Sequence, residues 1–241
     1  MIADIITIML KEWREFLVQR GSLRGNTLSL LIIVGFLGIL PPLHSGAVWI
    51  TSPGVFILSV WAPFLLVSSV VPDSFAGERE RHTLETLLAT RLSDRAILFG
   101  KILAAVGYGW GLTLMILAIG LITVNFAISS NGFIFYPITI CVGAIIFCIL
   151  GAGLASGVGV LISLRAPTVR HAHQVLTATG MLLLLLPVIG AIALPKSLKI
   201  QIVNIDLEKG LILSIVVLVM LNLIFLSAAI IKFRRTQLIL D

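Results

Sequence analysis

Six long apolar blocks without a charged residue constrain the fold of this chain more than any other feature. The blocks are 27–50, 54–72, 102–128, 134–164, 172–195 and 210–231. About 20 apolar residues suffice to cross the hydrocarbon core of a bilayer, where a helix satisfies its own backbone hydrogen bonds. The blocks do not alternate apolar and polar residues, as strands of a membrane barrel would. We therefore expect an all-α polytopic membrane protein with six transmembrane helices.

Composition supports this interpretation. Apolar residues make up 59% of the chain and charged residues only 12%, whereas a soluble domain has roughly a quarter charged residues. Two blocks need comment. The first is interrupted at Pro41-Pro42, and the fourth has 31 residues, so we expect it to tilt strongly or to extend beyond the bilayer.

The basic residues indicate the orientation. Six crossings put segments 1–26, 73–101, 165–171 and 232–241 on one side, and these segments hold 14 of the 17 Lys and Arg residues. Because Lys and Arg accumulate in cytoplasmic loops, we expect both termini to be cytoplasmic in a cell membrane protein. The net charge of +6 then reports topology. Nucleic acid is not an expected partner, since no arginine-rich tail or soluble basic domain is present.

An amphipathic helix is predicted at the N-terminus, within residues 1–22. At 100° per residue its apolar side chains share one arc, while the polar arc holds Asp4, Thr7, Lys11, Glu12, Arg14, Glu15 and Gln19. Such a helix lies in the membrane interface with its charges towards the cytoplasm. A passive anchor is the plainer interpretation. A lever or docking surface is the alternative.

The segment 73–96 is the most polar part of the chain and joins the second block to the third. Thr83 is a suitable N-cap, and Glu85 then lies in the first turn, where the helix dipole favours a carboxylate. A second helix start follows at Ser93 and Asp94. The predicted short helix carries an apolar ridge of Leu84, Leu87 and Leu88. A solvated loop is the alternative, but such a ridge on a polar loop favours a surface that covers it.

Small and polar residues inside the blocks predict close helix packing. Gly151, Ala155 and Gly159 recur at every fourth position, which lets backbones approach within the bundle or across a dimer seam. Asn222 is expected to form an interhelical hydrogen bond. The segment 195–209 is too polar to cross and is expected to form an external cap.

The sequence offers no catalytic or metal site. It lacks a phosphate-binding P-loop, a nucleophile elbow and the H-E-x-x-H motif. His171 and His173 are interpreted as interface histidines, because they point in different directions on a helix. An ion-coupled carrier would place an ionisable residue in mid-membrane, and the blocks contain none. Their lack of charge mildly favours an amphipathic or apolar cargo.

The polar segment also carries a resemblance to a known family. Its residues follow the pattern F-x-x-E-[KR]-E-x-G-T-L-E-x-L-L-x-[ST]-P-[LI]-S, with a Gly-Lys pair further on. The matching positions are Phe75, Glu78, Arg79, Glu80, Thr83, Leu84, Glu85, Leu87, Leu88, Leu92, Ser93, Ile97, Gly100 and Lys101. The pattern, the entry helix and the six crossings resemble permeases of type-2 ATP-binding-cassette (ABC) transporters. His82 and Arg91 depart from the pattern, because they stand where it has Gly and Pro.

The resemblance implies a function for this single permease domain, residues 1–241. A coupling helix between the second and third crossings would dock on a separate ATPase subunit, which binds ATP and Mg²⁺, while this chain binds no cofactor. The docking residues would be Glu78, Arg79, Glu80, Thr83, Leu84, Glu85, Leu87 and Leu88. The leucines would fill a groove and the glutamates would form ion pairs. A second permease copy is also implied, in a homodimer or a heterodimer, with membrane lipid around it.

Two other functions remain open at this point. A self-sufficient carrier or channel would move its substrate in liposomes that contain this chain alone. A membrane scaffold would bind partners without ATP-dependent flux. The resemblance favours an ATP-driven exporter, in which this chain forms the substrate pathway and has no enzymatic activity of its own.

Overall fold

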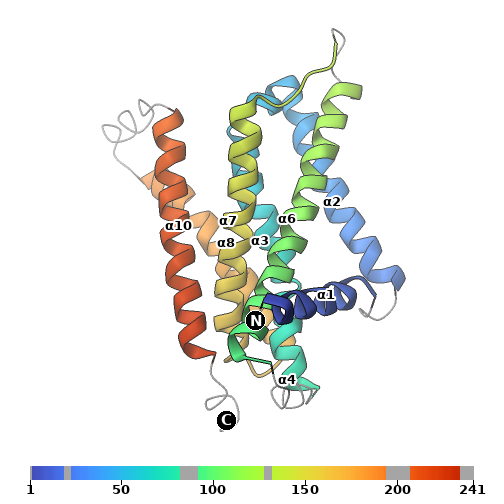
Figure 1. Ribbon diagram of the computed structural model, residues 1–241. Coiled ribbons are helices and arrows are strands. Elements are labelled where there is room, and N and C mark those ends of the chain that lie inside the picture. Colours follow the sequence, from blue (N-terminus) through green and yellow to red (C-terminus); the bar gives the residue numbers. More distant parts are fainter. Residues whose placement is uncertain (1, 19–22, 82–91, 128–131, 194–206, 234–241) are drawn as a thin grey trace.

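The computed structural model describes residues 2–18, 23–81, 92–127, 132–193 and 207–233, and it contains only helices and their connections in these ranges. The predicted all-α polytopic architecture is therefore confirmed. Helix α1 (Ile2–Val18) lies across one end of a bundle of long helices, as Figure 1 shows. The bundle helices then run in alternating directions. They are α2 (Leu23–Ser45), α3 (Gly54–Ser68), α6 (Asp94–Ala127), α7 (Ile138–Ser163), α8 (Val169–Ala193) and α10 (Leu207–Lys232).

Five segments are long and apolar enough to cross a membrane. They are Leu30–Thr51, Gly54–Glu80, Asp94–Ala127, Ile138–Ser163 and Glu208–Lys232, found among the described residues. The predicted block 172–195 falls largely in α8, a helix of 25 residues. At 1.5 Å per residue α8 is about 38 Å long, enough to span a hydrocarbon core. Five of the six predicted crossings thus coincide with candidate spans, and the crossing predicted at 172–195 stays a prediction.

Two block boundaries differ from expectation. Helix α2 continues through Pro41 and Pro42 and is followed by a 3₁₀-helix, Gly46–Thr51. Helix α2 ends at Ser45, and the next residue, Gly46, has a φ of 65°, a conformation that glycine adopts readily after a helix C-terminus. The helix of the fourth block is shorter than the 31-residue apolar run, because α7 begins only after Pro137 and has 26 residues. The expected tilt or extension beyond the bilayer stays a prediction.

The centre of the bundle is α7, which packs against α3, α6, α8 and α10. A Cβ at Gly151 would collide with the backbone of Val60 in α3, so this glycine permits a close approach inside the chain. The predicted interhelical bond of Asn222 is confirmed: its Nδ2 donates to the carbonyl of Leu150, 3.0 Å away. Small residues of α7 therefore serve packing within the bundle.

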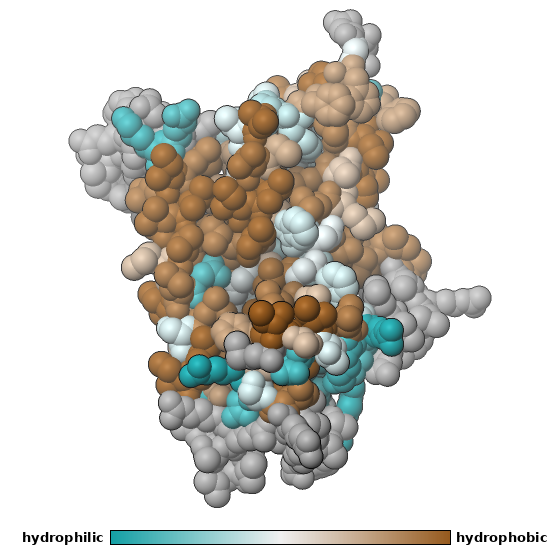
Figure 2. Space-filling model, in the orientation of Figure 1, coloured by the Kyte–Doolittle hydropathy of each residue, from teal (hydrophilic) through white to brown (hydrophobic). Residues whose placement is uncertain are grey.

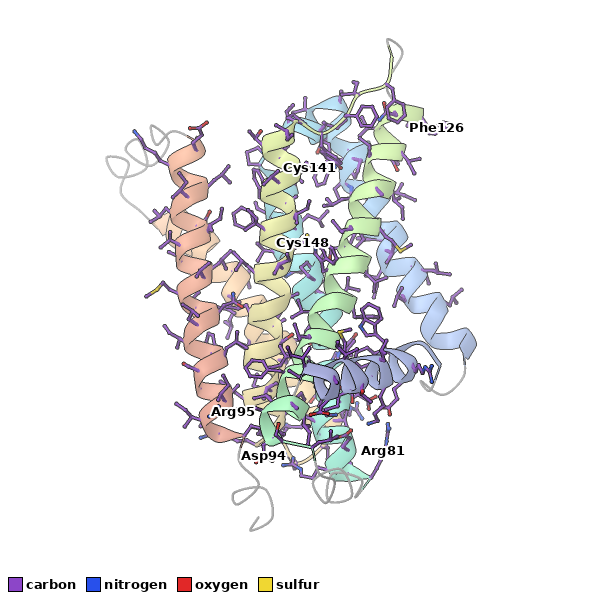
Figure 3. The ribbon with its side chains drawn as sticks, viewed as in Figure 1. Arg81, Asp94, Arg95, Phe126, Cys141 and Cys148 are labelled. Atoms are coloured by element: carbon purple, nitrogen blue, oxygen red, sulfur yellow. The ribbon has the colours of Figure 1, made fainter. Side chains whose placement is uncertain are left out.

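Polar and apolar residues separate along the bundle axis. On the face drawn in Figure 2, apolar side chains cover the middle, and hydrophilic residues gather around α1 at one end. Figure 3 places Arg81, Asp94 and Arg95 at that same end and Phe126 at the opposite end. The start of α1 and the end of α10 both lie at the polar end (Figure 1). The first and the last described helices therefore reach the same end of the bundle.

Candidate functional site

Helix α1 packs tightly onto the N-terminal half of α6. A Cβ at Gly100 would lie 2.7 Å from Cβ of Ile8, and one at Gly107 would lie 3.0 Å from the ring of Trp13. Because the two glycines have no side chains, α1 can pack closely against α6 at these positions. The indole N–H of Trp13 also donates to the carbonyl of Ala104, 3.0 Å away. These contacts fix both the position and the rotation of α1.

A buried lysine lies at the centre of this interface. The side chain of Lys101 is 1% exposed, and its ammonium is 2.9 Å from Oε1 of Glu12 in α1 and 2.8 Å from Oε1 of Glu78. It also donates to the carbonyl of Ser74 at 2.8 Å and lies 5.4 Å above the ring centroid of Phe75. A buried ammonium is stable only when it is paired and hydrogen-bonded, and these four partners satisfy that requirement.

Lys11 extends the network to the surface. Its ammonium lies 3.2 Å from Oε1 of Glu78, 3.5 Å from Oε1 of Glu12 and 3.2 Å from Oε1 of Glu15. Burial alone would lower the pKa of Lys11, but the carboxylates of Glu78, Glu12 and Glu15 outweigh it and raise that pKa above its ordinary value. We call Lys11, Glu12, Glu15, Glu78 and Lys101 the ion cluster.

The structure corrects one detail of the amphipathic helix predicted at the N-terminus, namely the exposure of Glu12. Glu12 was expected on the polar arc of α1, facing the cytoplasm, yet its side chain is 1% exposed. The pattern counts polarity around one helix, and it cannot register a lysine 89 residues away that turns a polar position into a buried contact. Helix α1 is therefore fastened to the bundle by buried charge as well as by its apolar face.

The chain reaches the ion cluster from α3 through an irregular turn. A π-helix, Asp73–Gly77, is followed by one helical turn, α4 (Glu78–Glu80). Phe75 packs edge-on against Phe233 beyond the end of α10, with ring centroids 6.0 Å apart. Short π-helical segments often occur at functional sites because they redirect side chains. Here the segment directs a carboxylate inwards to Lys101 and an aromatic ring towards the last helix.

Helix α4 also binds the turn between α7 and α8. A guanidinium nitrogen of Arg79 donates to the carbonyl of Leu164 at 3.1 Å. A carboxylate oxygen of Glu80 accepts from the backbone N–H of Val169 at 3.4 Å, at the first residue of α8. A carboxylate is favoured at a helix N-terminus, where backbone N–H groups lack partners within the helix. The three residues of α4 thus contact α1, α6, the residue that follows α7 and the first residue of α8.

The segment that follows α4 holds the remaining predicted docking residues. Residues 82–91 lie outside the described ranges, so Thr83, Leu84, Glu85, Leu87 and Leu88 are not placed, nor is the short helix predicted there. The chain is described again from Leu92, and the predicted helix start is confirmed. The hydroxyl of Ser93 accepts from the N–H of Ala96 at 3.2 Å, and α6 begins at Asp94.

The predicted site residues therefore divide into two groups. Glu78, Arg79 and Glu80 are described, and each contacts another part of this chain; Glu78 is 8% exposed. Sequence reasoning missed Glu12 and the role of Lys101, although Lys101 was noted in the Gly-Lys pair. The ion cluster is not arranged for chemistry, because its carboxylates are occupied by ammonium groups. Among the described residues no group of three His, Cys, Asp or Glu could hold a metal ion.

Comparison with known proteins bears on most of the chain. A search among curated proteins finds no match to this sequence. The sequence profile of the family described as "ABC-2 type transporter" matches residues 4–199. The match covers most of α1, the α3–α4 turn, residues 82–91 and the start of α6, and it agrees with the resemblance carried by the polar segment. The chain belongs to the ABC-2 type transporter family, as a membrane-spanning component of an ABC transporter.

Proposed function

We propose that this chain is the permease subunit of an ATP-driven exporter and that it receives ATPase-driven motion through the loop 73–96, in which residues 82–91 would carry the coupling helix. The observation that carries the proposal is how the segment 82–91 is held at both ends. Before it, α4 binds Lys101 through Glu78 and the α7–α8 turn through Arg79 and Glu80. After it, Ser93 caps α6. A displacement of the segment would therefore reach α1, α6 and the α7–α8 turn together.

The expected partner is a separate ATPase chain that binds ATP and Mg²⁺. Leu84, Leu87 and Leu88 would fill a groove on it, and Thr83 would begin the docking helix. Glu85 would orient the contact by ion pairing. The earlier assignment changes for Glu78: because its carboxylate lies within the ion cluster, we propose that it transmits motion and does not touch the ATPase.

Orientation and assembly complete the proposal. The polar end would face the cytoplasm of a cell with this chain in its cell membrane, in keeping with the distribution of Lys and Arg. The exposed apolar face of α10 would contact lipid and a second permease copy, in a homodimer or a heterodimer, while α2 would face lipid. Residues 195–206, proposed as part of an external cap, lie outside the described ranges, while 207–209 form the first turn of α10.

A site-specific photo-crosslinker tests the partner and its docking place. It would replace Thr86 in the chain expressed in its native membrane, and the captured proteins would be identified by mass spectrometry. The matched control replaces Thr51, an exposed threonine at the opposite end of the bundle. We expect Thr86 to capture a protein with a Walker A motif and Thr51 not to do so. Efficient labelling that yields only lipid or this chain from Thr86 contradicts the proposal.

A further inference from the structure

A cavity of about 460 Å³ lies between α2, α3, α6 and α8. Most of its wall is apolar, including Ile33 and Phe36 of α2, Trp61 and Leu65 of α3, and Tyr108 of α6. Its volume is within the range of small-molecule sites, which are also mostly apolar with a few polar groups. Figure 1 shows the first half of α2 diverging from α6 towards the polar end of the bundle.

The polar lining of the cavity is concentrated at that same end. Ser69 follows the last turn of α3, and His173 and Thr177 lie in the first three turns of α8. The Thr177 hydroxyl is 3.5 Å from Nδ1 of His173. Arg170 is exposed and precedes His173 by three residues, so both occupy one face of α8. None of the described residues that line the cavity is acidic.

This separation defines the chemistry of an occupant. The apolar wall suits a flexible hydrocarbon chain that enters from the bilayer, because nothing along it offers a partner to a charged group. The end with His173 and Arg170 suits a head group that accepts hydrogen bonds and carries negative charge. A quaternary ammonium head would meet Arg170 without any carboxylate to balance it. A neutral alcohol would fill the same wall but gain nothing from the arginine.

We propose that the cavity binds an amphiphile with one hydrocarbon chain and an anionic head group, taken from the membrane. Carboxylate, sulfate and phosphate ester heads share the chemistry that Arg170 and His173 recognise. As the assignment of a cargo class, the proposal rests on the transport function proposed above. Binding itself needs only this chain, so it is measured without the ATPase partner, and the two proposals can fail separately.

The test uses the full chain in nanodiscs of zwitterionic lipid. A long-chain fatty acid with a photoreactive group in its tail is the probe, and labelled peptides are mapped by mass spectrometry. We expect labelling of α2 and α3 around the cavity. An alkyl sulfate should compete for it, whereas the alcohol and the alkyltrimethylammonium of equal chain length should compete about tenfold less well, the difference expected for one hydrogen bond to a charged group.

Two pairs of variants locate the site. Ile33→Trp places a larger ring in the cavity and should reduce labelling by about tenfold, since overfilled sites lose their ligand contacts. Leu31→Trp, two residues away on α2 and exposed outside the cavity, should leave labelling unchanged. Arg170→Gln should weaken the acid but not the alcohol, while Arg165→Gln, an exposed arginine before α8, should affect neither.

Three results would overturn the proposal. One is equal competition by the acid, the alcohol and the ammonium compound. Another is labelling that ignores both Ile33→Trp and Arg170→Gln in folded protein, as judged by unchanged thermal unfolding. The third is efficient disulfide formation between two copies that carry Ile33→Cys, because a second copy of the chain would then occupy the cavity.

Discussion

Replacing Lys101 with Met gives the sharpest prediction about the ion cluster. The ammonium of Lys101 has carboxylates at 2.8 and 2.9 Å, and the substitution leaves those of Glu78 and Glu12 buried without it. Removing one partner of a buried ion pair costs about 3–5 kcal/mol. Lys11 still lies within 3.5 Å of both carboxylates, so we expect the lower end of that range, about 3 kcal/mol.

The loss should appear as undocking of α1. A cost of about 3 kcal/mol corresponds to about a hundredfold change in an equilibrium constant. Hydrogen exchange followed by mass spectrometry should therefore show the amides of α1 exchanging about a hundredfold faster in Lys101→Met. Lys232→Met, which removes an exposed lysine from the end of α10, is the matched control and should change stability by less than about 0.5 kcal/mol.

A second substitution distinguishes buried charge from lost packing. Met is similar in length to Glu, and replacing a buried ion pair by apolar residues of similar volume is often neutral or stabilising. Lys101→Met combined with Glu12→Met should therefore recover about half of the loss or more. The reasoning is refuted if Lys101→Met resembles the Lys232→Met control, or if the second substitution adds to the damage.

Three further predictions concern the packing around the ion cluster and within the bundle. Gly100→Ala should displace α1, because its Cβ would lie 2.7 Å from Ile8, whereas Gly111→Ala meets nothing within 4 Å and should be neutral; protease protection of α1 reports the difference. Trp13→Phe removes a hydrogen bond to a backbone carbonyl of α6 and should lower the free energy of unfolding by about 1 kcal/mol, measured by denaturant titration. Asn222→Leu breaks the bond between α10 and α7 and should cost about 0.6–1.7 kcal/mol in the same assay; an unchanged midpoint would contradict either assignment.

Much of the fold follows from local rules that the sequence displays. Uncharged runs predict spanning helices, since lipid requires backbone groups to be satisfied within a segment. The Ser93 cap and the Asn222 bond were predicted because each depends on one residue type in an unambiguous setting. The Pro41-Pro42 pair was interpreted as an interruption, yet α2 passes through it. Tertiary context overrides local preference at such positions.

The ion cluster could not be predicted, because it depends on contacts across the chain. Glu12, Glu78 and Lys101 come from α1, α4 and α6, and only their assembly shows that a polar arc on α1 is partly buried. The pattern of residues 73–101 marked Glu78 and Lys101 without indicating that they bind each other. Long-range charge pairing leaves little trace in periodicity, which reports one helix at a time.

In the proposed mechanism the ion cluster links the docking segment to the bundle, and ATPase stimulation by variants of Lys101 is the measurement that tests this link. The ATPase chain captured at Thr86 would be reconstituted with the permease in liposomes, and its rate of ATP hydrolysis would be measured with wild-type chain, Lys101→Met and Lys232→Met. We expect that Lys101→Met still binds the ATPase but no longer stimulates hydrolysis, whereas Lys232→Met stimulates it as the wild type does. Full stimulation by Lys101→Met, in protein whose α1 exchanges rapidly, would contradict this link.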